Sequence, residues 1–330
     1  MKENGSEQEA QHSFAVAEKY YRLALSEAKK IGAYSNQYLE TEARIANVCL
    51  LQHKDQVAEK HYQNVIKLLA GKKRDKTLHR ETMIWVEDLA NTYTDMSKGN
   101  SEQSLRYLLH ALKIRDIISG DSHPDLSTTL WRLCMAYSGR GNYAAVEPLA
   151  TRMLKVDQLR SGRDSERVAH DLTTLGVAKY NLGRHTEAES YIRQALDIYA
   201  SKENSKPLAV GMTRTQLAHI LRSQKQYKLA ETEAKSALAW MERHFGKNKT
   251  NTNAYRELVA EILVDEGKNV EANTYFQKAL AIEEATYGKN SPRLIGILKR
   301  LKTFYNRQKA YSKEKKVEAR IQSLAKAKAK

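Results

Sequence analysis

Residues 133–154, LCMAYSGRGNYAAVEPLATRML, decide the fold because close relatives of this stretch recur along most of the chain. A pair of mostly small or apolar residues marks each recurrence, at Ala24-Leu25, Val65-Ile66, Ala111-Leu112, Met153-Leu154, Ala195-Leu196, Ala237-Leu238, Ala279-Leu280 and Ile321-Gln322. The steps between these pairs are 41, 46 and then five times 42 residues. A second small or apolar site stands seven residues before most pairs. Because sites seven residues apart lie on one face of a helix, each recurrence predicts one helix.

A further apolar landmark precedes each of these helices except the first, usually 13 residues before the earlier site. The landmarks are Ile45, Leu89, Leu133, Leu175, Leu217, Val259 and Leu301. Glycine-containing turns, such as Gly141-Asn142-Tyr143 and Gly183-Arg184-His185, separate the landmark from the helix that follows. Each unit is therefore predicted to be a hairpin of a leading and a trailing helix. A single hairpin cannot bury its apolar face alone, so the hairpins must stack.

The composition favours an all-α chain that grows by addition of hairpins. Only four prolines and 15 glycines occur in 330 residues, and strand-like alternation is absent. The predicted fold is an α-solenoid of about eight helical hairpins. We expect a polar N-terminal extension at 1–13, a single solenoid at 14–323 and a basic tail at 324–330.

The chain resembles the tetratricopeptide-repeat solenoids of the kinesin-light-chain-like, 42-residue type. The resemblance covers roughly residues 14 to 323. Its most specific stretches are Gly120-Asp-Ser-His123-Pro124, a loop that leads into a helix, and Tyr227-Lys-Leu-Ala230-Glu231. The resemblance implies a right-handed superhelix whose leading helices line the concave groove. It also implies a non-enzymatic scaffold for protein binding.

Catalytic and metal-binding motifs with the required spacing are absent from the sequence. We therefore predict no enzymatic activity, no cofactor and no metal, with structural roles for the ten histidines. The two cysteines, Cys49 and Cys134, are predicted to be packed thiols in leading helices. Residues 1–13 lack the apolar core of a secretory signal, which predicts a cytoplasmic protein without a membrane span; a secreted or periplasmic location stays open if a signal peptide has been removed.

The positive charge is concentrated at the C-terminal end. Of the formal net charge of +16, residues 288–330 carry +12, because 14 Lys and Arg face only Glu314 and Glu318. The basic end comprises Lys299, Arg300, Lys302, Lys313, Lys315 and Lys316 with the tail beyond them. Two interpretations stay open: a docking surface for an acidic protein, nucleic acid or anionic lipid, or a solubilising end of the solenoid.

The implied groove gives a set of candidate partner-binding residues. Side chains two residues before or after a landmark, or one turn further on, should point into the groove. These residues are Asn91, Trp131, Met135, Thr173, Val177, Tyr180, Thr215, His219 and Arg222. We expect Trp131 to be an aromatic anchor and Arg222 to pair with an acidic partner residue. The alternative for Trp131 and Met135 is ordinary packing between helices.

The seventh unit carries an acidic stripe instead. Glu257, Glu261 and Asp265 are spaced i, i+4 and i+8, so they share one helical face. The stripe is predicted either to contact a partner or to form ion pairs with neighbouring hairpins. Because Glu87 and Glu257 stand where a carboxylate clamp would require a cation, such a clamp is not predicted. Asn47 and Asn91 could still bond a peptide backbone.

Two function classes follow from these patterns. The first is a non-enzymatic scaffold that binds a linear or helical protein segment in the concave groove. The second is binding of nucleic acid or another polyanion through the basic C-terminal repeat, residues 288–330. Self-association through the terminal repeats is a further possibility.

Overall fold

The computed structural model describes residues 2–32, 35–74, 80–96, 102–123, 125–201 and 206–328. The 46-residue step of the repeat indicates an insertion near residues 97–100; these residues and Pro124 of the predicted loop lie outside the described ranges. The described residues form fifteen α-helices and three short 3-10 turns and contain no strand, which confirms the all-α fold class. Within them, no helix combines the length and the apolar composition that a membrane crossing requires.

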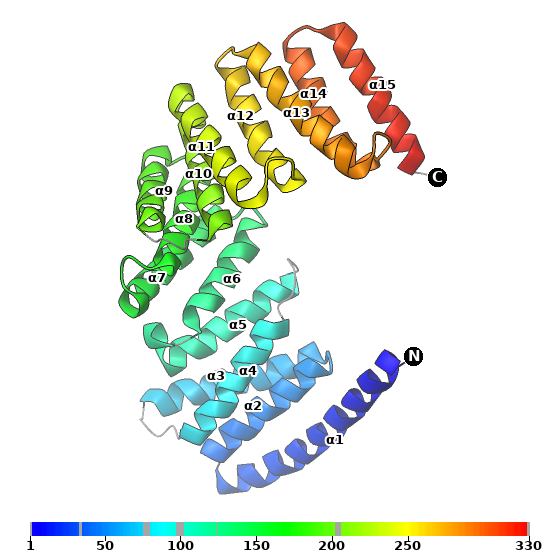
Figure 1. Ribbon diagram of the computed structural model, residues 1–330. Helices are drawn as coiled ribbons and strands as arrows, with labels where there is room; N and C mark the ends of the chain where they lie inside the picture. The colour runs from blue at the N-terminus through cyan, green and yellow to red at the C-terminus, as the bar shows by residue number, and fades with distance from the viewer. Residues whose placement is uncertain are drawn as a thin grey trace. The chain divides into compact units, whose positions relative to one another are not determined.

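The chain divides into two compact units, Met1–Arg160 and Ser161–Lys330. Unit 1 contains a long single helix followed by three hairpins (Figure 1). Its helices are α1 (Lys2–Ile31), α2 (Asn36–Leu51), α3 (Asp55–Arg74), α4 (Arg80–Met96), α5 (Glu102–Ile118), α6 (Leu126–Ser138) and α7 (Tyr143–Ser161), with the 3-10 turn η1 (Gly120–Ser122) before α6.

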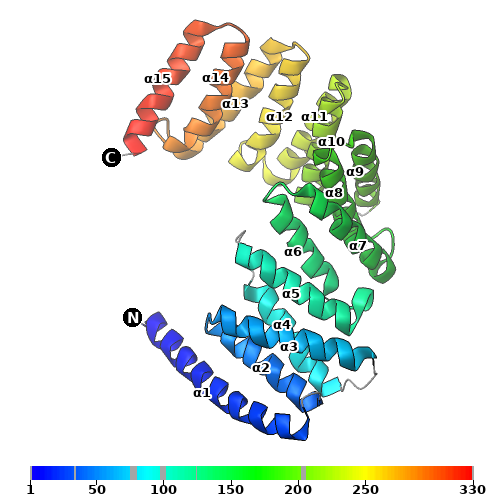
Figure 2. The same ribbon diagram turned by 180° about the vertical axis from the view of Figure 1, so that it is seen from behind.

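Unit 2 contains four hairpins that follow one another in chain order, as the view from behind also shows (Figure 2). Its helices are α8 (Glu166–Asn181), α9 (His185–Ala200), α10 (Pro207–Ser223), α11 (Tyr227–Phe245), α12 (Asn253–Asp265), α13 (Asn269–Tyr287), α14 (Ile295–Arg307) and α15 (Tyr311–Lys328). The 3-10 turns η2 (Thr250–Thr252) and η3 (Pro292–Leu294) lead into α12 and α14.

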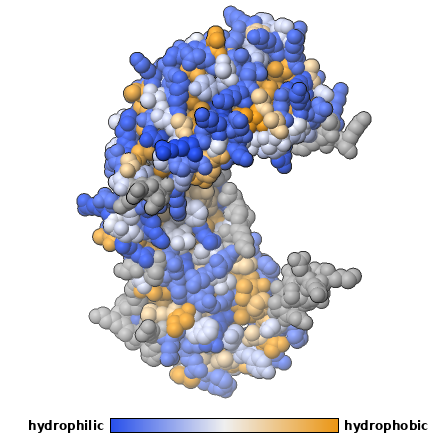
Figure 3. All heavy atoms as spheres, in the orientation of Figure 1, coloured by the Kyte–Doolittle hydropathy of each residue, from blue (hydrophilic) through white to orange (hydrophobic). Residues whose placement is uncertain are grey.

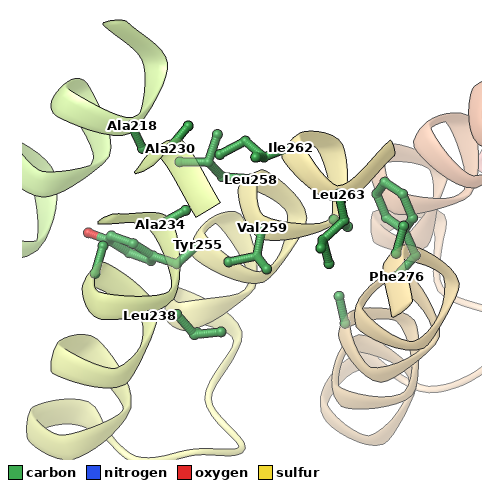
Figure 4. Packing of buried hydrophobic residues seen from close by; sticks show 14 of the residues in the cluster. Ala218, Ala230, Ala234, Leu238, Tyr255, Leu258, Val259, Ile262, Leu263 and Phe276 are labelled. Carbon is green, nitrogen blue, oxygen red and sulfur yellow. The ribbon is translucent and has the colours of Figure 1, made fainter. Parts of the chain in front are cut away.

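The predicted landmarks are the core positions of both units. Every leading-helix landmark, from Ile45 to Leu301, is buried to an exposure of 1% or less. Small residues of the trailing helices, such as Ala188, Ala195, Ala230 and Ala237, are completely buried. Figure 4 shows this arrangement in unit 2, where Leu258, Val259 and Ile262 of α12 reach toward Ala230 and Ala234 of α11. Alanine at these sites lets the helix axes approach closely, and the landmark residues fill the space between them.

Glycine permits the tightest helix contacts. A Cβ atom on Gly176 of α8 would lie 2.8 Å from Ile192 Cδ1 of α9. A Cβ atom on Gly211 of α10 would lie 2.5 Å from the sulfur of Met241 on α11. Both hairpins therefore depend on a missing side chain at the point of closest approach.

The six hairpin turns that the structure describes end their leading helices in the same way. A residue in the left-handed conformation follows the helix, and the next amide N–H bonds back to a carbonyl five residues earlier, as from Arg184 to Lys179 O (2.9 Å). Glycine occupies this turn position at 141, 183 and 267, whereas His53, Lys225 and Lys309 occupy it elsewhere with φ between 53° and 61°. The predicted turn chemistry is confirmed where glycine stands, and three turns form without it.

The first repeat differs from the others. Residues 2–31 form one continuous helix, so residues 2–13, predicted as a polar extension, are helical and the expected separate leading helix is not formed. Residues up to Lys328 continue α15, so most of the predicted tail is helical as well. The division at 14 and 324 and the handedness of the superhelix stay predictions.

Candidate functional site: the leading-helix faces

We call the side of the leading helices that lies two residues before or after each landmark, or one turn beyond those positions, the leading-helix face. The predicted partner-binding residues lie on it in two groups, three in unit 1 and six in unit 2. On the side of the molecule shown in Figure 3, hydrophobic residues form small groups among hydrophilic ones in both units. Each unit is described by itself.

The leading-helix face of unit 1 exposes large apolar side chains. On α6, Trp131 is 39% exposed and Met135 is 55% exposed, although the landmark Leu133 between them is fully buried. On α4, Ile84 is 61% exposed. Trp131 and Met135 are therefore exposed beside a buried landmark, although more than half of the Trp131 side chain is covered. Their use for a partner stays a prediction.

Ile84 forms part of a hollow of about 540 Å³ between α4, the end of α5 and His123. Met83, Trp85 and Ile118 supply the rest of its apolar lining. Glu87, Asp88, Asn91 and His123 supply the polar lining. The guanidinium of Arg44 from α2 lies 3.6 Å from the centre of a Trp85 ring, which holds this indole in place by a cation–π contact.

A buried arginine organises the polar side of this hollow. Arg115 of α5 is only 1% exposed and donates to Asn91 Oδ1 (2.7 Å), Thr94 Oγ1 (3.0 Å) and Thr129 Oγ1. It also donates to Glu87 (3.3 Å). A buried charge requires such partners, and here they come from α4 and α6 on either side. Asn91, predicted to bond a partner backbone, thus uses its oxygen within the protein, and its use for a partner stays a prediction.

Glu87, His123 and Asp125 also lie close enough together to suggest a metal site. However, His123 Nδ1 accepts the backbone N–H of Asp125 (3.1 Å), so the proton of the neutral ring resides on Nε2. That Nε2–H donates to Glu87 Oε2 (2.7 Å). A metal at Nε2 would need the opposite tautomer, with Nδ1 as a donor, so this arrangement favours a structural hydrogen bond.

Asn47 is also engaged inside unit 1. Its Nδ2 donates to Asp88 Oδ2 (2.6 Å), and its Oδ1 accepts from Thr92 Oγ1 (2.7 Å). These bonds join α2 to α4 across the leading-helix face. Asn47 is therefore a link between repeats, and its predicted use for a peptide backbone is not favoured by this geometry.

The leading-helix face of unit 2 begins with polar and half-buried groups on α8 and α10. Thr173 and Thr213 lie 3.3 Å apart through their Oγ1 atoms, and Thr215 donates to Gly211 O (2.9 Å). Val177 and Tyr180 are half-buried, and the Tyr180 ring lies 5.4 Å from the His185 ring. His219 is half-buried, and burial lowers the pKa of its imidazole.

Arg222 does not stand free in unit 2. It donates to Asp265 Oδ2 (2.5 Å) and Glu261 Oε2 (2.8 Å) of the acidic stripe. From the other side, Arg300 of α14 binds Glu257 (2.8 Å) and Glu261 (2.7 Å), and Arg307 lies 3.6 Å from Asp265. The stripe forms internal ion pairs, as one of the two interpretations predicted. We call this set of six residues the ion ladder.

The ion ladder borders a second hollow of about 340 Å³. Val264, Phe276 and Phe304 give it apolar walls, and Lys299 and Thr303 of α14 complete its rim. Among the described cations lining it, Lys299 lies within ion-pair distance of no carboxylate. Lys299 was predicted as part of the basic end, but it stands two residues before the landmark Leu301. The groove rule applied to the eighth unit therefore identifies Lys299 and Thr303.

Some cations of the basic end pair with acidic side chains, and others do not. Arg300 belongs to the ion ladder, and Lys302 pairs with Glu318. Lys313 lies over the Tyr305 ring at 5.6 Å. Lys315 and Lys316 are exposed on the outer side of α15, where no acidic residue is exposed with them.

The two cysteines are buried in α2 and α6, and burial raises the pKa of the Cys49 thiol to about 11.

Comparisons with known proteins agree with this architecture. A family model described as tetratricopeptide repeat matches residues 172–202, which cover most of the α8–α9 hairpin. A search of the curated proteins finds no significant match.

Solved structures share the fold at low identity. Nearly identical TPR-like repeats of a kinesin light chain from Podosopora anserina superpose with a TM-score of 0.51 at 17% identity, covering 63% of this chain and 98% of that chain. Aspartyl phosphate phosphatase F from Bacillus subtilis gives a TM-score of 0.54 at 13% identity, covering 96% of this chain and 91% of that one. A STAND ATPase with a tetratricopeptide repeat sensor from Pyrococcus horikoshii gives a TM-score of 0.53 at 16% identity, covering 95% of this chain and 50% of that chain.

One assignment follows from the 42-residue spacing, the buried landmarks, the repeat at 172–202 and these fold neighbours. The chain is a tetratricopeptide-like α-solenoid with the fold of kinesin-light-chain repeats.

Proposed function

We propose that this chain is a non-enzymatic scaffold that binds a linear or helical protein segment along its leading-helix faces. The observation that carries the proposal is the exposure of large apolar side chains on the leading helices of unit 1: Ile84 of α4, which lines the 540 Å³ hollow, and Trp131 and Met135 of α6. Rigid aromatic and apolar side chains of this kind dominate the affinity of protein interfaces.

Directional groups stand next to this apolar surface. Asn91 and Asp88 both line the hollow and are exposed, so they offer an amide and a carboxylate there. A bound segment could bury an apolar side chain against Ile84 and Trp85 while its backbone carbonyl accepts from Asn91. Such a division into an apolar anchor and a few polar contacts is typical of groove recognition.

The fold by itself leaves catalysis open, because one fold neighbour is an aspartyl phosphate phosphatase. We base the non-enzymatic proposal on this chain's own groups. The titratable side chains of the hollow are Glu87, Asp88 and His123. Glu87 and His123 are bonded to each other, Glu87 is also bonded to Arg115, and Asp88 accepts from Asn47 (2.6 Å). A general base needs a lone pair directed at its substrate, whereas each of these groups is already engaged in a hydrogen bond within the protein.

The test uses peptides selected from a random displayed library against the full chain. We expect Trp131→Ala to weaken the selected peptides by about 30-fold, corresponding to about 2 kcal/mol, with an unchanged melting temperature. Leu159→Ala is the matched control, because Leu159 is 76% exposed on the trailing helix α7. Equal losses in both variants, or loss of stability in Trp131→Ala alone, would reject the site.

A second candidate function is polyanion binding through residues 288–330. The favouring observation is the outer side of α15, where Lys315, Lys316 and Lys326 are exposed, with the exposed ring of Tyr311 at the start of the helix. Ammonium groups along one helix face can neutralise phosphates without reading sequence. This candidate needs no contact with the leading-helix faces.

Substitution is a better test of this candidate than deletion, because Leu324 of α15 is buried and packs on the core of unit 2. The affinity for duplex DNA should fall less steeply with salt in the double variant Lys315→Gln with Lys316→Gln. We expect the magnitude of the slope of log affinity against log salt to decrease by roughly 1.8. Lys60→Gln with Lys67→Gln, at exposed sites of α3, is the control. An unchanged slope in the first pair would leave only a solubilising role.

A further inference from the structure

The apolar hollow of unit 1 has a negative charge at its edge that the protein does not neutralise. Its described lining includes two carboxylates, Glu87 and Asp88, and no lysine or arginine. The charge of Glu87 is compensated from beneath, because Glu87 binds the buried Arg115 (3.3 Å). Asp88 is exposed and accepts from the neutral amide of Asn47 (2.6 Å), which leaves its charge in place. Among the described residues, no cation forms an ion pair with Asp88.

A second carboxylate of α4 lies on the same side of the helix. Asp95 follows Asp88 by seven residues, so the two side chains share one helical face and lie about 10.5 Å apart along the axis. Asp95 is exposed as well. In the part of the chain that the structure describes, it forms no ion pair either.

The leading helices before and after α4 contain one cation each, and both cations are engaged elsewhere. Arg44 of α2 pairs with Glu40 (2.6 Å), and its guanidinium lies over the Trp85 ring. Arg132 of α6 donates to the backbone carbonyl of Thr94 (2.7 Å). The neighbouring helices therefore leave the two carboxylates of α4 without a counter-ion.

Unit 2 shows which group a carboxylate at this position binds. Asp95 and Asp265 each stand six residues after the landmark of their helix. Asp265 accepts from Arg222 (2.5 Å) and lies 3.6 Å from Arg307. Both arginines come from the leading helices before and after it, so the partner of this position in the ion ladder is a guanidinium group.

The neighbours of Asp95 lack these arginines. Arg222 stands five residues after its landmark, and the same position in α2 is Leu50. Arg307 stands six residues after its landmark, and the same position after α6 is Gly139. Unit 1 thus has the carboxylate of the ladder without its cations, which favours a cation supplied by a bound partner.

We propose that the leading-helix face of unit 1 binds a basic protein segment. A lysine or arginine next to the apolar anchor of this segment pairs with Asp88, and a second cation pairs with Asp95. The anchor itself occupies the hollow against Ile84. Charged pairs beside an apolar anchor fix the orientation of a bound segment and give specificity. This inference rests on the proposed scaffold function, since it names the partner chemistry of the same face.

The charges of the two hollows also separate possible partners. An acidic segment or a nucleic acid would bring like charges toward Asp88 and Asp95, which costs binding energy. The unit 2 hollow is lined by four cations and one carboxylate, so its lining has the opposite sign. A basic segment therefore suits the face of unit 1.

Selection from two displayed libraries of random peptides against the full chain tests the proposal. One library lacks lysine and arginine, and the other lacks aspartate and glutamate. We expect the peptides that Trp131→Ala weakens to come from the second library and to contain lysine or arginine. If neutral or acidic peptides are weakened by Trp131→Ala instead, the scaffold function stands and the basic partner is overturned.

Neutralising the two carboxylates separates contact from the general field of the protein. Asp88→Asn with Asp95→Asn should weaken a selected basic peptide about tenfold at low salt and less at high salt. Asp88→Asn keeps an oxygen that accepts from Asn47, so the melting temperature should not change. Glu102→Gln with Asp197→Asn is the matched control, because it removes the same charge from exposed carboxylates of the trailing helices α5 and α9.

A charge swap tests the pair directly. Asp88→Lys should weaken the selected peptide further, and replacing the pairing lysine of the peptide by glutamate should restore about tenfold in affinity. A merely structural role of Asp88 would give no such recovery. Equal losses in the neutralised and control variants, or no recovery after the swap, would overturn the proposal. If Trp131→Ala weakens no peptide from either library, the scaffold function is wrong and the proposal fails with it.

Discussion

The two units use the same helical hairpin but give their leading-helix faces different chemistry. In unit 1 the charged groups are drawn inward, around the buried Arg115, and the face itself exposes Ile84, Trp131 and Met135. In unit 2 the charged groups lie on the face, where the ion ladder of α10, α12 and α14 joins three successive leading helices. The landmarks set the fold, and the positions two residues away set the surface.

This difference gives the two faces different roles. A face whose polar groups bond beneath the surface leaves apolar area for a partner. A face covered by paired charges binds its own repeats together and presents little unpaired charge, apart from Lys299. We therefore expect substitutions beneath the face of unit 1 to cost more stability than substitutions in the ion ladder.

The largest expected effect compares two arginines. Arg115→Met should lower the free energy of unfolding by about 3–5 kcal/mol, because it leaves Glu87, Asn91 and buried hydroxyls without their donor. Arg222→Met should cost only about 1 kcal/mol, since Arg222 is partly exposed and its carboxylates keep Arg300 and Arg307. Urea unfolding of both variants measures this, and similar losses would refute the contrast between a buried network and a surface ladder.

A second comparison uses one substitution at two helical glycines. Gly211→Ala in unit 2 should destabilise by roughly 2 kcal/mol, because the added Cβ would meet Met241 of the facing helix. Gly71→Ala in unit 1 should stabilise by about 0.5–1 kcal/mol, since no atom lies within 4 Å and alanine favours the helix. Thermal melting of the two variants checks the opposite signs.

The third comparison concerns pH. Burial raises the pKa of Glu257 in unit 2 to about 7, and its attraction to the half-exposed Arg300 only partly opposes this. In unit 1 the hydrogen bond from Lys54, with further bonds from Arg22 and Gln52, lowers the pKa of Glu18 to about 2. The two carboxyl groups should therefore affect stability in opposite directions.

Glu257 binds its proton more tightly in the folded state than the ordinary value of 4.5. Its ionisation thus costs stability above pH 7, and this cost disappears as the pH falls from 7 to 4.5. Glu257→Gln should stabilise the protein by roughly 1–2 kcal/mol at pH 8 and not at pH 4.5. Glu18 gives the converse, because its stabilisation is present above pH 4.5 and is lost only as the pH falls toward 2.

Urea midpoints between pH 4.5 and 8 separate these two groups. Glu257→Gln should flatten the pH dependence in this window. Glu18→Gln should lower the midpoint by a nearly constant amount across it. If the Glu257→Gln variant keeps the pH dependence of the wild-type urea midpoint, a group other than Glu257 causes that dependence.

The sequence predicted the landmarks because a fixed period places them, and all seven are core residues. The ion ladder also left a signal. Arg222 pairs with acidic residues 39 and 43 positions later, and Arg300 pairs with acidic residues 39 and 43 positions earlier. Both separations are close to one 42-residue repeat, so the paired residues lie on the same face of successive leading helices. The unit 1 hollow left none, since it requires Ile118 at the end of α5 and His123 just after the 3-10 turn η1, and no helical period describes the path between them.

The smallest expected effect lies in the hairpin turns, where the two units again allow a matched pair. Lys225 has φ of 61° at the turn position that Gly183 occupies one repeat earlier with φ of 77°. A side chain in the left-handed region costs roughly 1–2 kcal/mol, whereas glycine there loses about 0.5–1 kcal/mol more chain entropy on folding. Lys225→Gly should therefore stabilise unit 2 by about 0.5 kcal/mol, and His53→Gly should do the same for unit 1.

The favourable charge of Lys225 near the C-terminus of α10 opposes part of this gain at low salt, so the increase in melting temperature should be larger at high salt. Gly183→Lys is the reverse control and should destabilise by a similar amount. If Lys225→Gly instead lowered the melting temperature at every salt concentration, the lysine would be stabilising its turn by more than the charge at the helix end.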